Sequence, residues 1–305
     1  MHSVQYVDHL PTDSRTWVID ELEVAARSLG RPWRVLVQRP VSALGPEPLP
    51  WIWFLHGRSA SVADMRPVLA ALARAMDDGA VPPYVVAVPD APDGHRESWW
   101  IDSDYRPPDD APHDELSRRP GLPLESSLLL EALPAIEARY GGPDTPAQRI
   151  IAGISMGGGA ALRWAITHPE TFGAALLLSP AVFEQSVPPG SAMRQPGPYN
   201  VESQIFDTGT YGRVLHYPTL LSQRPVRDTV TPVVTVVGDR EAPRMAGAER
   251  HDLDLEAARL HASLKLRPDF ASSLRIIDGD HDWPTWERAV VLALEVLTKR
   301  AGDAT

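Results

Sequence analysis

The 305-residue sequence contains no cysteine, only two lysines and no long apolar run. The absence of cysteine excludes disulfide bonds, thiolate nucleophiles and cysteine-ligated zinc. No apolar run approaches the roughly 18 residues that a membrane-spanning helix needs. Acidic residues outnumber basic ones, 40 to 29, which gives a formal net charge of −11. This charge opposes polyanion binding, so we expect neither a nucleic acid nor a membrane as partner.

The N-terminal stretch MHSVQYVDHLPTDSR has neither the basic start nor the apolar segment of a secretion signal, and we therefore expect a cytoplasmic protein. With 43% hydrophobic residues the chain can bury a large core. Since α/β folds reach this length as one unit, we predict a single domain over residues 1–305. The sequence does not indicate the oligomeric state.

Two stretches with alternating apolar residues, 16–25 and 33–39, are separated by a turn signal and predict an antiparallel hairpin. Short apolar runs, typical of strands buried on both faces of a parallel sheet, occur at 51–55, 84–88, 150–152 and 174–178, and two further strands are expected at 233–237 and 274–277. Helical spacing is found at 62–77, 124–139, 157–168, 252–264 and 285–299. This alternation predicts an α/β fold with a mostly parallel sheet covered by helices on both faces. Irregular residues 183–226 predict a cap-like insertion within it.

Residues 153–157 read Gly-Ile-Ser-Met-Gly between a strand pattern and a helix pattern. This G-x-S-x-G arrangement is typical of a nucleophile elbow, in which a sharp turn exposes the serine hydroxyl. Glycine fits at 153 and 157 because a Cβ there would collide with the turn. Ser155 is therefore a candidate nucleophile, although a glycine-rich helix start with an incidental serine has the same pattern.

A serine hydroxyl needs a base to become a nucleophile, and the base needs an orienting acid. In this fold class the acid and then the histidine follow the serine, each just after a strand. His281 follows the strand at 274–277, so we predict that it takes the proton from Ser155 and later returns it to the leaving group. Asp239 and Glu241 both follow the strand at 233–237, and their spacing does not decide which is the acid.

The oxyanion formed during acyl transfer needs two backbone N–H donors. We expect one from Met156, directly after the serine, and a second from the loop that contains Gly57 and Arg58. His56 in the same loop is expected to shape it rather than to transfer protons. The Arg58 side chain either binds an anionic substrate or is simply solvated.

Other patterns give weaker signals. The stretches 251–254 and 278–282 combine histidine with aspartate, but the first resembles an acidic helix start and the second supplies the base, so we expect no metal. The glycines at 157–159 lack the Lys-Ser/Thr of a phosphate loop, and we expect no cofactor. Four tryptophans either line an acyl pocket or pack in the core, and Trp100 and Trp283 are our candidates for substrate binding.

Five separated motifs stand in order along the chain, namely HGR at 56–58, DGHRESWWIDS at 93–103, GISMGGG at 153–159, GDRE at 238–241 and DGDHDWPTW at 278–286. Together they resemble the esterase D-like branch of the α/β-hydrolases, which includes S-formylglutathione hydrolases, feruloyl and siderophore esterases and mycolyltransferases. The resemblance implies an α/β-hydrolase fold, with Ser155 as nucleophile and His281 as base. It also implies Glu241 rather than Asp239 as the acid, and an oxyanion hole made by the N–H groups of Arg58 and Met156.

We therefore expect a serine esterase that cleaves a carboxylic ester of a small molecule through an acyl-Ser155 intermediate. An acyltransferase would use the same three side chains with an alcohol as acceptor. A small-molecule receptor or pseudo-enzyme would keep them but turn over poorly. The sequence does not specify the acyl or the alcohol group of the substrate.

Overall fold

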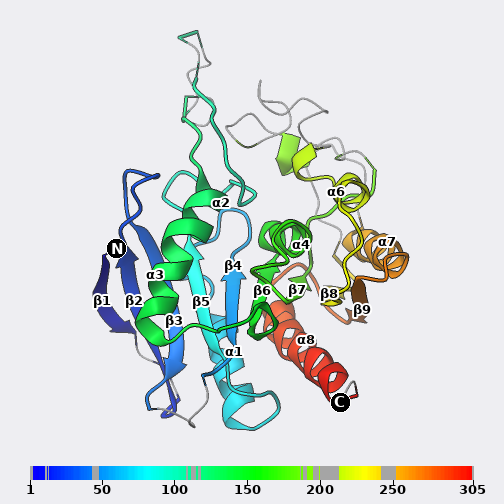
Figure 1. Cartoon of the computed structure of the whole chain (residues 1–305), viewed down its shortest axis with the longest axis horizontal. Coiled ribbons are helices and arrows are strands. Elements are labelled where there is room, and N and C mark those ends of the chain that lie inside the picture. Colours follow the sequence, from blue (N-terminus) through cyan, green and yellow to red (C-terminus); the bar gives the residue numbers. More distant parts are fainter. Residues whose placement is uncertain are drawn as a thin grey trace.

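The structure is a computed structural model that describes residues 3–10, 12, 14–42, 48–107, 109–110, 115, 118–185, 187, 191–194, 199, 213–241 and 252–303. These residues form one sheet of nine strands in the order β1-β2-β3-β5-β4-β6-β7-β8-β9 (Figure 1). The strands are β1 (Val4–Leu10), β2 (Trp17–Val24), β3 (Trp33–Pro40), β4 (Trp51–Leu55), β5 (Val85–Asp90), β6 (Arg149–Ile154), β7 (Ala174–Leu178), β8 (Thr231–Gly238) and β9 (Phe270–Ile277). The helices are α1 (Arg66–Asp77), α2 (Leu124–Ser127), α3 (Leu133–Tyr140), α4 (Met156–Thr167), α6 (Tyr217–Gln223), α7 (Leu253–Lys265) and α8 (Trp283–Asp303).

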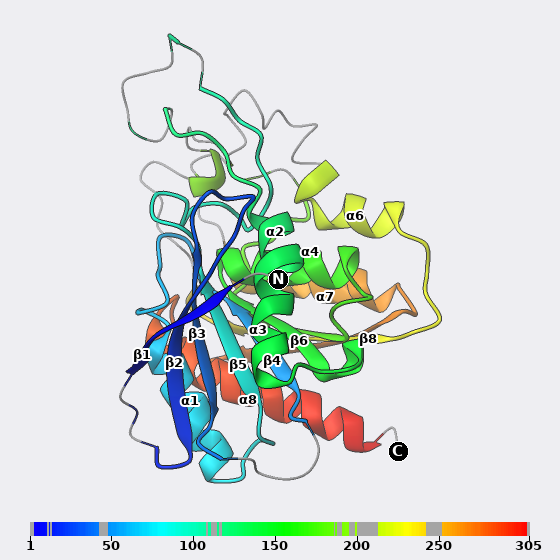
Figure 2. The same cartoon turned by 60° about the vertical axis from the view of Figure 1, so that its left-hand side comes forward.

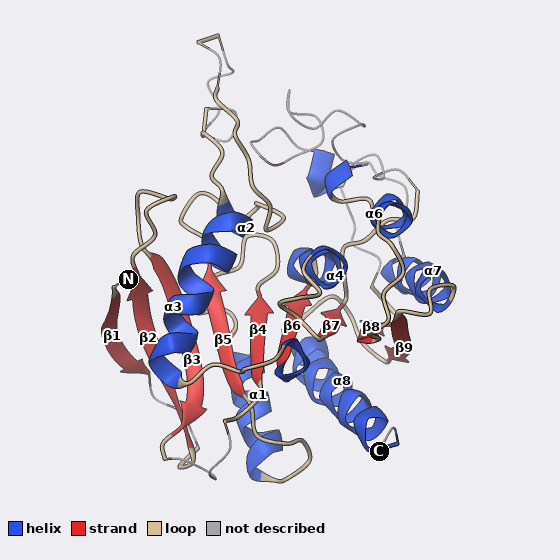
Figure 3. Cartoon of the chain, in the orientation of Figure 1, coloured by secondary structure: helices blue, strands red, loops and turns tan. Residues whose placement is uncertain are grey.

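The sheet is antiparallel at its N-terminal edge and parallel elsewhere. Strands β1, β2, β3 and β5 pair antiparallel in that order, and β5, β4, β6, β7, β8 and β9 pair parallel. The arrows of β4, β5 and β6 point the same way in Figure 3, so their carboxyl ends lie at one edge of the sheet. The predicted hairpin and the mostly parallel sheet are therefore confirmed.

Helices cover both faces of the sheet because side chains of the buried strands alternate between two apolar clusters. In β4, Trp51, Trp53 and Leu55 join the cluster that includes α3 and α4, whereas Ile52 and Phe54 join the one that includes α1 and α8. Helix α7 adds to the first cluster, and α1 contacts α8 on the opposite face (Figures 1 and 2). Both faces of the central strands are thus buried, which explains why β4 and β7 are continuous apolar runs.

The elements differ from the predicted ranges mainly at their ends. Residues 62–65 form turns, so α1 begins only at Arg66. The predicted helix at 124–139 contains a π-helical turn, Leu128–Ala132, between α2 and α3. Strand β1 was not predicted because its side chains are largely exposed and show no apolar alternation.

The predicted cap-like insertion at 183–226 lies only partly within the described residues. The described part contains a 3-10 turn at Ala192–Arg194 and helix α6. The cap and the single-domain arrangement over 1–305 therefore stay predictions. Among the described helices, not one combines the length and the apolar character that crossing a membrane requires.

Candidate active site

Ser155 lies on a strained turn between β6 and α4. Its backbone has φ 53° and ψ −114°, which is rare for a residue with a side chain. The two flanking glycines make the turn possible, because a Cβ on Gly153 would lie 2.1 Å from the Gly157 carbonyl oxygen. A Cβ on Gly157 would lie 2.2 Å from the carbonyl oxygen of Leu55 in the neighbouring strand. The turn is therefore fixed by close backbone contacts, as the sequence pattern predicts.

His281 links the serine to a carboxylate. Its Nε2 lies 3.0 Å from Ser155 Oγ, and its Nδ1 lies 2.7 Å from Glu241 Oε2. A carboxylate only accepts hydrogen bonds, so Nδ1 carries the proton and Nε2 is left to accept from the serine hydroxyl. This tautomer is the one that a general base needs.

Glu241 is buried and held by several donors. Its Oε1 accepts hydrogen bonds from the Gly238 N–H and the Ser179 hydroxyl, both at 2.6 Å. The Ser179 oxygen in turn accepts one from the Trp286 indole N–H at 3.0 Å. With Oε2 facing the histidine, both carboxylate oxygens of Glu241 have hydrogen-bond partners.

Asp239 has a different position. Its side chain is 48% exposed, and it accepts a hydrogen bond from the Gly279 N–H at 3.1 Å. It therefore holds the loop that carries His281 without contacting the imidazole. Of the two candidates that spacing left open, the structure brings Glu241 to the histidine.

The loop after β4 lies against the serine. A Cβ on Gly57 would be 3.5 Å from Ser155 Cβ, an ordinary contact distance. The His56 side chain is completely buried, and burial lowers its pKa to about 4, so the ring is neutral. Its Nδ1 donates to the Gly57 carbonyl at 2.8 Å, and its Nε2 accepts from the Ala91 N–H at 3.1 Å. In a trans peptide the carbonyl and the next N–H point in opposite directions, so the Arg58 N–H points away from His56.

Ser155 and His281 line a cavity of about 540 Å³ whose walls are mainly apolar. The Arg58 side chain lines it too, and its guanidinium lies 2.9 Å from the Glu97 carboxylate. The other Glu97 oxygen accepts from the Ser59 hydroxyl at 2.8 Å. The cavity residues are Gly57, Arg58, Ser59, Ala60, Asp64, Trp99, Ile154, Ser155, Ala181, Phe183, Ser191, Leu253, His281, Trp283 and Trp286.

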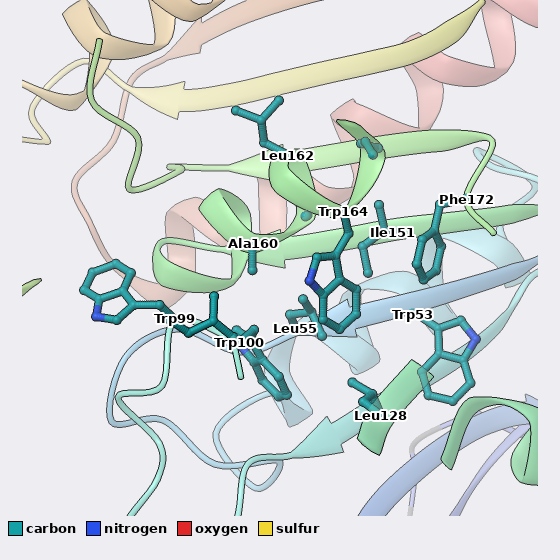
Figure 4. Close-up of a cluster of buried hydrophobic side chains, with 14 of the residues drawn as sticks. Trp53, Leu55, Trp99, Trp100, Leu128, Ile151, Ala160, Leu162, Trp164 and Phe172 are labelled. Carbon is teal, nitrogen blue, oxygen red and sulfur yellow. The ribbon is translucent and has the colours of Figure 1, made fainter. Parts of the chain in front are cut away.

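The two tryptophans predicted to bind substrate lie in different places. Trp283 lines the cavity, whereas Trp100 is fully buried and does not. The Trp100 ring stacks on Trp33 with centroids 6.4 Å apart, and its indole N–H donates to the His56 carbonyl. Its neighbour Trp99 lines the cavity instead, and Figure 4 shows the two rings turned away from each other. Trp100 is thus a core residue that supports the loop after β4, and its role in substrate binding stays a prediction.

One contributor to the site carries no sequence motif. Ser179 follows β7 without any recognisable pattern, yet it donates to Glu241 and accepts from the indole N–H of Trp286, which belongs to the motif at 278–286. Its φ of 46° marks a second sharp turn at the carboxyl end of a strand. Within the described part of the chain, no group of three or more histidine, aspartate or glutamate side chains is placed to hold a metal ion.

Comparisons with known proteins place this chain in an esterase family. A family model described as "Putative esterase" matches residues 26–296. No curated protein sequence matches the chain. Among solved structures, an S-formylglutathione hydrolase from Agrobacterium tumefaciens has a TM-score of 0.68 at 18% identity, covering 97% of both chains. A ferulic acid esterase has a TM-score of 0.67 at 19% identity, covering 93% of this chain and 98% of its own.

A third structure, the fluorophosphonate-binding serine hydrolase F of Staphylococcus aureus, has a TM-score of 0.64 at 17% identity. It covers 92% of this chain and 97% of its own. These likenesses confirm the predicted α/β-hydrolase fold. Together with the family match they confirm the resemblance to the esterase D-like branch.

Proposed function

Because the chain belongs to the esterase family whose model spans residues 26–296, we propose that it hydrolyses a carboxylic ester of a small molecule through an acyl-Ser155 intermediate. One observation carries this proposal. Ser155, His281 and Glu241 form an unbroken hydrogen-bonded chain with distances of 3.0 and 2.7 Å, at the wall of an apolar cavity. A nucleophile, a base and an orienting acid in this order are the arrangement that acyl transfer to serine requires.

In the first half-reaction, Ser155 Oγ attacks the ester carbonyl while His281 Nε2 takes the hydroxyl proton. Negative charge develops on the carbonyl oxygen, and the N–H groups of Arg58 and Met156 are proposed to bind it. The intermediate collapses, the bond to the alcohol breaks, and the imidazolium returns its proton to the leaving oxygen. Glu241 stabilises the imidazolium throughout.

In the second half-reaction, water replaces the alcohol and the same steps run in reverse order. His281 takes a proton from water, the hydroxide oxygen bonds to the acyl carbon, and the proton passes to Ser155 as the acid leaves. Transfer of the acyl group to an alcohol needs the same residues, and no described contact favours it over hydrolysis.

The test is the Ser155→Ala variant, assayed with chromogenic esters. We expect kcat to fall by about 10⁴-fold or more, with the thermal unfolding midpoint unchanged, and a fluorophosphonate probe to label the wild type only. Ser28→Ala, the same substitution at an exposed serine in the turn between β2 and β3, is the matched control and should behave as wild type. Turnover retained by Ser155→Ala would remove Ser155 from its role. Adding an alcohol and measuring the new ester against free acid would detect acyl transfer.

A further inference from the structure

The wall of the active-site cavity that faces α4 and α6 separates it from a second apolar space. Trp99, Ala181 and Phe183 line the cavity that contains Ser155, and the same three residues line the space behind it. The far side of that space is formed mainly by small or aliphatic side chains of α4 and by residues at α6, namely Gly159, Ala160, Leu162, Leu215, Tyr217 and Leu220. It holds only about 10 Å³, less than one water molecule needs, so it is closed as it stands.

The backbone on both sides of this wall is held in place. The Ala181 N–H donates to the Ser155 carbonyl at 2.9 Å, and the Glu184 N–H donates to the Glu256 carboxylate at 3.0 Å. These two bonds anchor the chain on either side of Phe183, whose side chain is buried. An acyl chain entering from Ser155 therefore meets a ring whose backbone cannot easily withdraw.

Trp99 is equally constrained. Its φ is 54°, and the next residue, Trp100, has the same value, which bulky side chains adopt only when their surroundings enforce it. The Trp99 N–H points to the sulfur of Met156 at 3.3 Å, and Trp100 is fixed by its bond to the His56 carbonyl. These contacts hold Trp99 and Trp100 in the strained backbone conformation.

The space behind the wall suits hydrocarbon rather than charge. Among the described residues that line it, the charged side chain is Arg163, which forms an ion pair with Glu125 and donates to the Trp100 carbonyl. The aliphatic surface of Leu162, Leu215 and Leu220 is what a methylene chain would contact. Each buried methylene is worth roughly a fourfold gain in binding.

We propose that Phe183, supported by Trp99, sets the upper limit on acyl length, and that the space between α4 and α6 is a latent acyl subsite that opens when the Phe183 side chain is shortened. The acyl groups concerned are uncharged straight chains. This inference rests on the proposed esterase function, because it assigns an acyl position relative to Ser155.

The experiment measures kcat/KM for p-nitrophenyl esters of straight-chain acids from two to twelve carbons. The wild type should prefer short chains, with kcat/KM falling steeply once the acyl group reaches the wall. Phe183→Ala should move the optimal acyl length toward longer chains by two or more carbons. It should also raise kcat/KM for those longer esters at least tenfold relative to kcat/KM for p-nitrophenyl acetate. Trp283→Phe changes a residue that lines the cavity but not the space behind it. It should therefore change kcat/KM by a similar factor for esters of every chain length.

A second substitution separates the opening of the subsite from general loosening. Leu220 lines the far side of the space, so Leu220→Phe added to Phe183→Ala should refill it and restore the short-chain preference. If Phe183→Ala is unstable, Phe183→Leu gives the same test with a smaller shift. The proposal would be overturned by a folded Phe183→Ala enzyme that hydrolyses p-nitrophenyl acetate and keeps the chain-length profile of the wild type. A wild type that prefers long chains would overturn it as well. Absence of turnover with every ester in the wild type would instead reject the esterase function itself.

Discussion

Replacing Glu241 by glutamine tests the proposed acid because it exchanges one acceptor oxygen for an NH₂ donor with almost no change in volume. Glu241 Oε1 already accepts from the Gly238 N–H and the Ser179 hydroxyl. A glutamine must keep its carbonyl oxygen toward these donors, and its NH₂ group therefore turns to His281 Nδ1. Since two donors cannot face each other, Nδ1 loses its proton and Nε2 gains it.

The magnitude follows from this change of tautomer. A protonated Nε2 cannot accept the Ser155 proton, so the base is lost although all heavy atoms stay in place. The equivalent change in another serine hydrolase lowers kcat by about 10⁴-fold, which corresponds to roughly 5.4 kcal/mol of activation free energy. Asp239→Asn is the matched control because it keeps an oxygen for the Gly279 N–H at an exposed position, and we expect less than about a tenfold effect.

The assay is kcat for a chromogenic ester, measured with thermal unfolding to show that both variants are folded. Nitrogen NMR of the His281 ring reports the tautomer directly and is independent of turnover. A larger loss in Asp239→Asn than in Glu241→Gln would transfer the acid role to Asp239. A slow Glu241→Gln enzyme whose ring still carries its proton on Nδ1 would refute the tautomer argument.

Two further predictions concern stability. The folded-state pKa of His56, about 4, lies below its ordinary value of 6.5, because the folded protein favours the neutral ring. This difference contributes up to about 3 kcal/mol to the free energy of unfolding. The contribution should be complete above pH 6.5 and disappear as the pH falls toward 4. Urea unfolding from pH 7 to 4.5 should therefore show a smaller loss in His56→Gln than in wild type, and equal losses would contradict this. Gly157→Ala should cost about 1–3 kcal/mol and most of the activity, because its Cβ would meet the Leu55 carbonyl. Gly30→Ala meets no neighbouring atom but strains a residue with a φ of 66°, so it should lose some stability and stay active.

The sequence specified strands β4 and β7 well because each is an unbroken apolar run. Strands β4 and β7 match their predicted ranges, 51–55 and 174–178. Burial on both faces of the sheet leaves no polar position to interrupt such a run. By contrast, β1 pairs only with β2 and is largely exposed, so neither an apolar run nor alternation marks it.

Side-chain direction was the part that periodicity could not supply. Trp99 and Trp100 are adjacent and chemically identical, and both have a φ of 54°. In a regular strand, side chains alternate between the two faces, but this left-handed backbone does not follow that rule. The ring that enters the cavity is therefore set by packing around Trp33 and Met156. For the same reason spacing alone did not separate Asp239 from Glu241. Their different contacts depend on where the loop that carries His281 packs against the loop after β8.

The site is best understood from the order of the last four strands. Strands β6, β7, β8 and β9 are consecutive neighbours, and each is followed by one member of the hydrogen-bonded network, respectively Ser155, Ser179, Glu241 and His281. Adjacent strands are about 4.8 Å apart, so β9 lies roughly 14 Å from β6. The histidine must therefore return across two strands to reach the serine.

That return is directed by contacts between the loops after β8 and β9. The Arg240 N–H donates to the Gly279 carbonyl at 3.0 Å, and the Asp239 carboxylate accepts from the Gly279 N–H. In the loop after β9, the Asp280 N–H donates at 3.1 Å to the hydroxyl of Thr285 in the first turn of α8. Of the two carboxylates after β8, Asp239 binds the backbone of the loop that carries His281, whereas Glu241 binds the imidazole ring. The two acids, two residues apart, therefore make different contacts with the same loop.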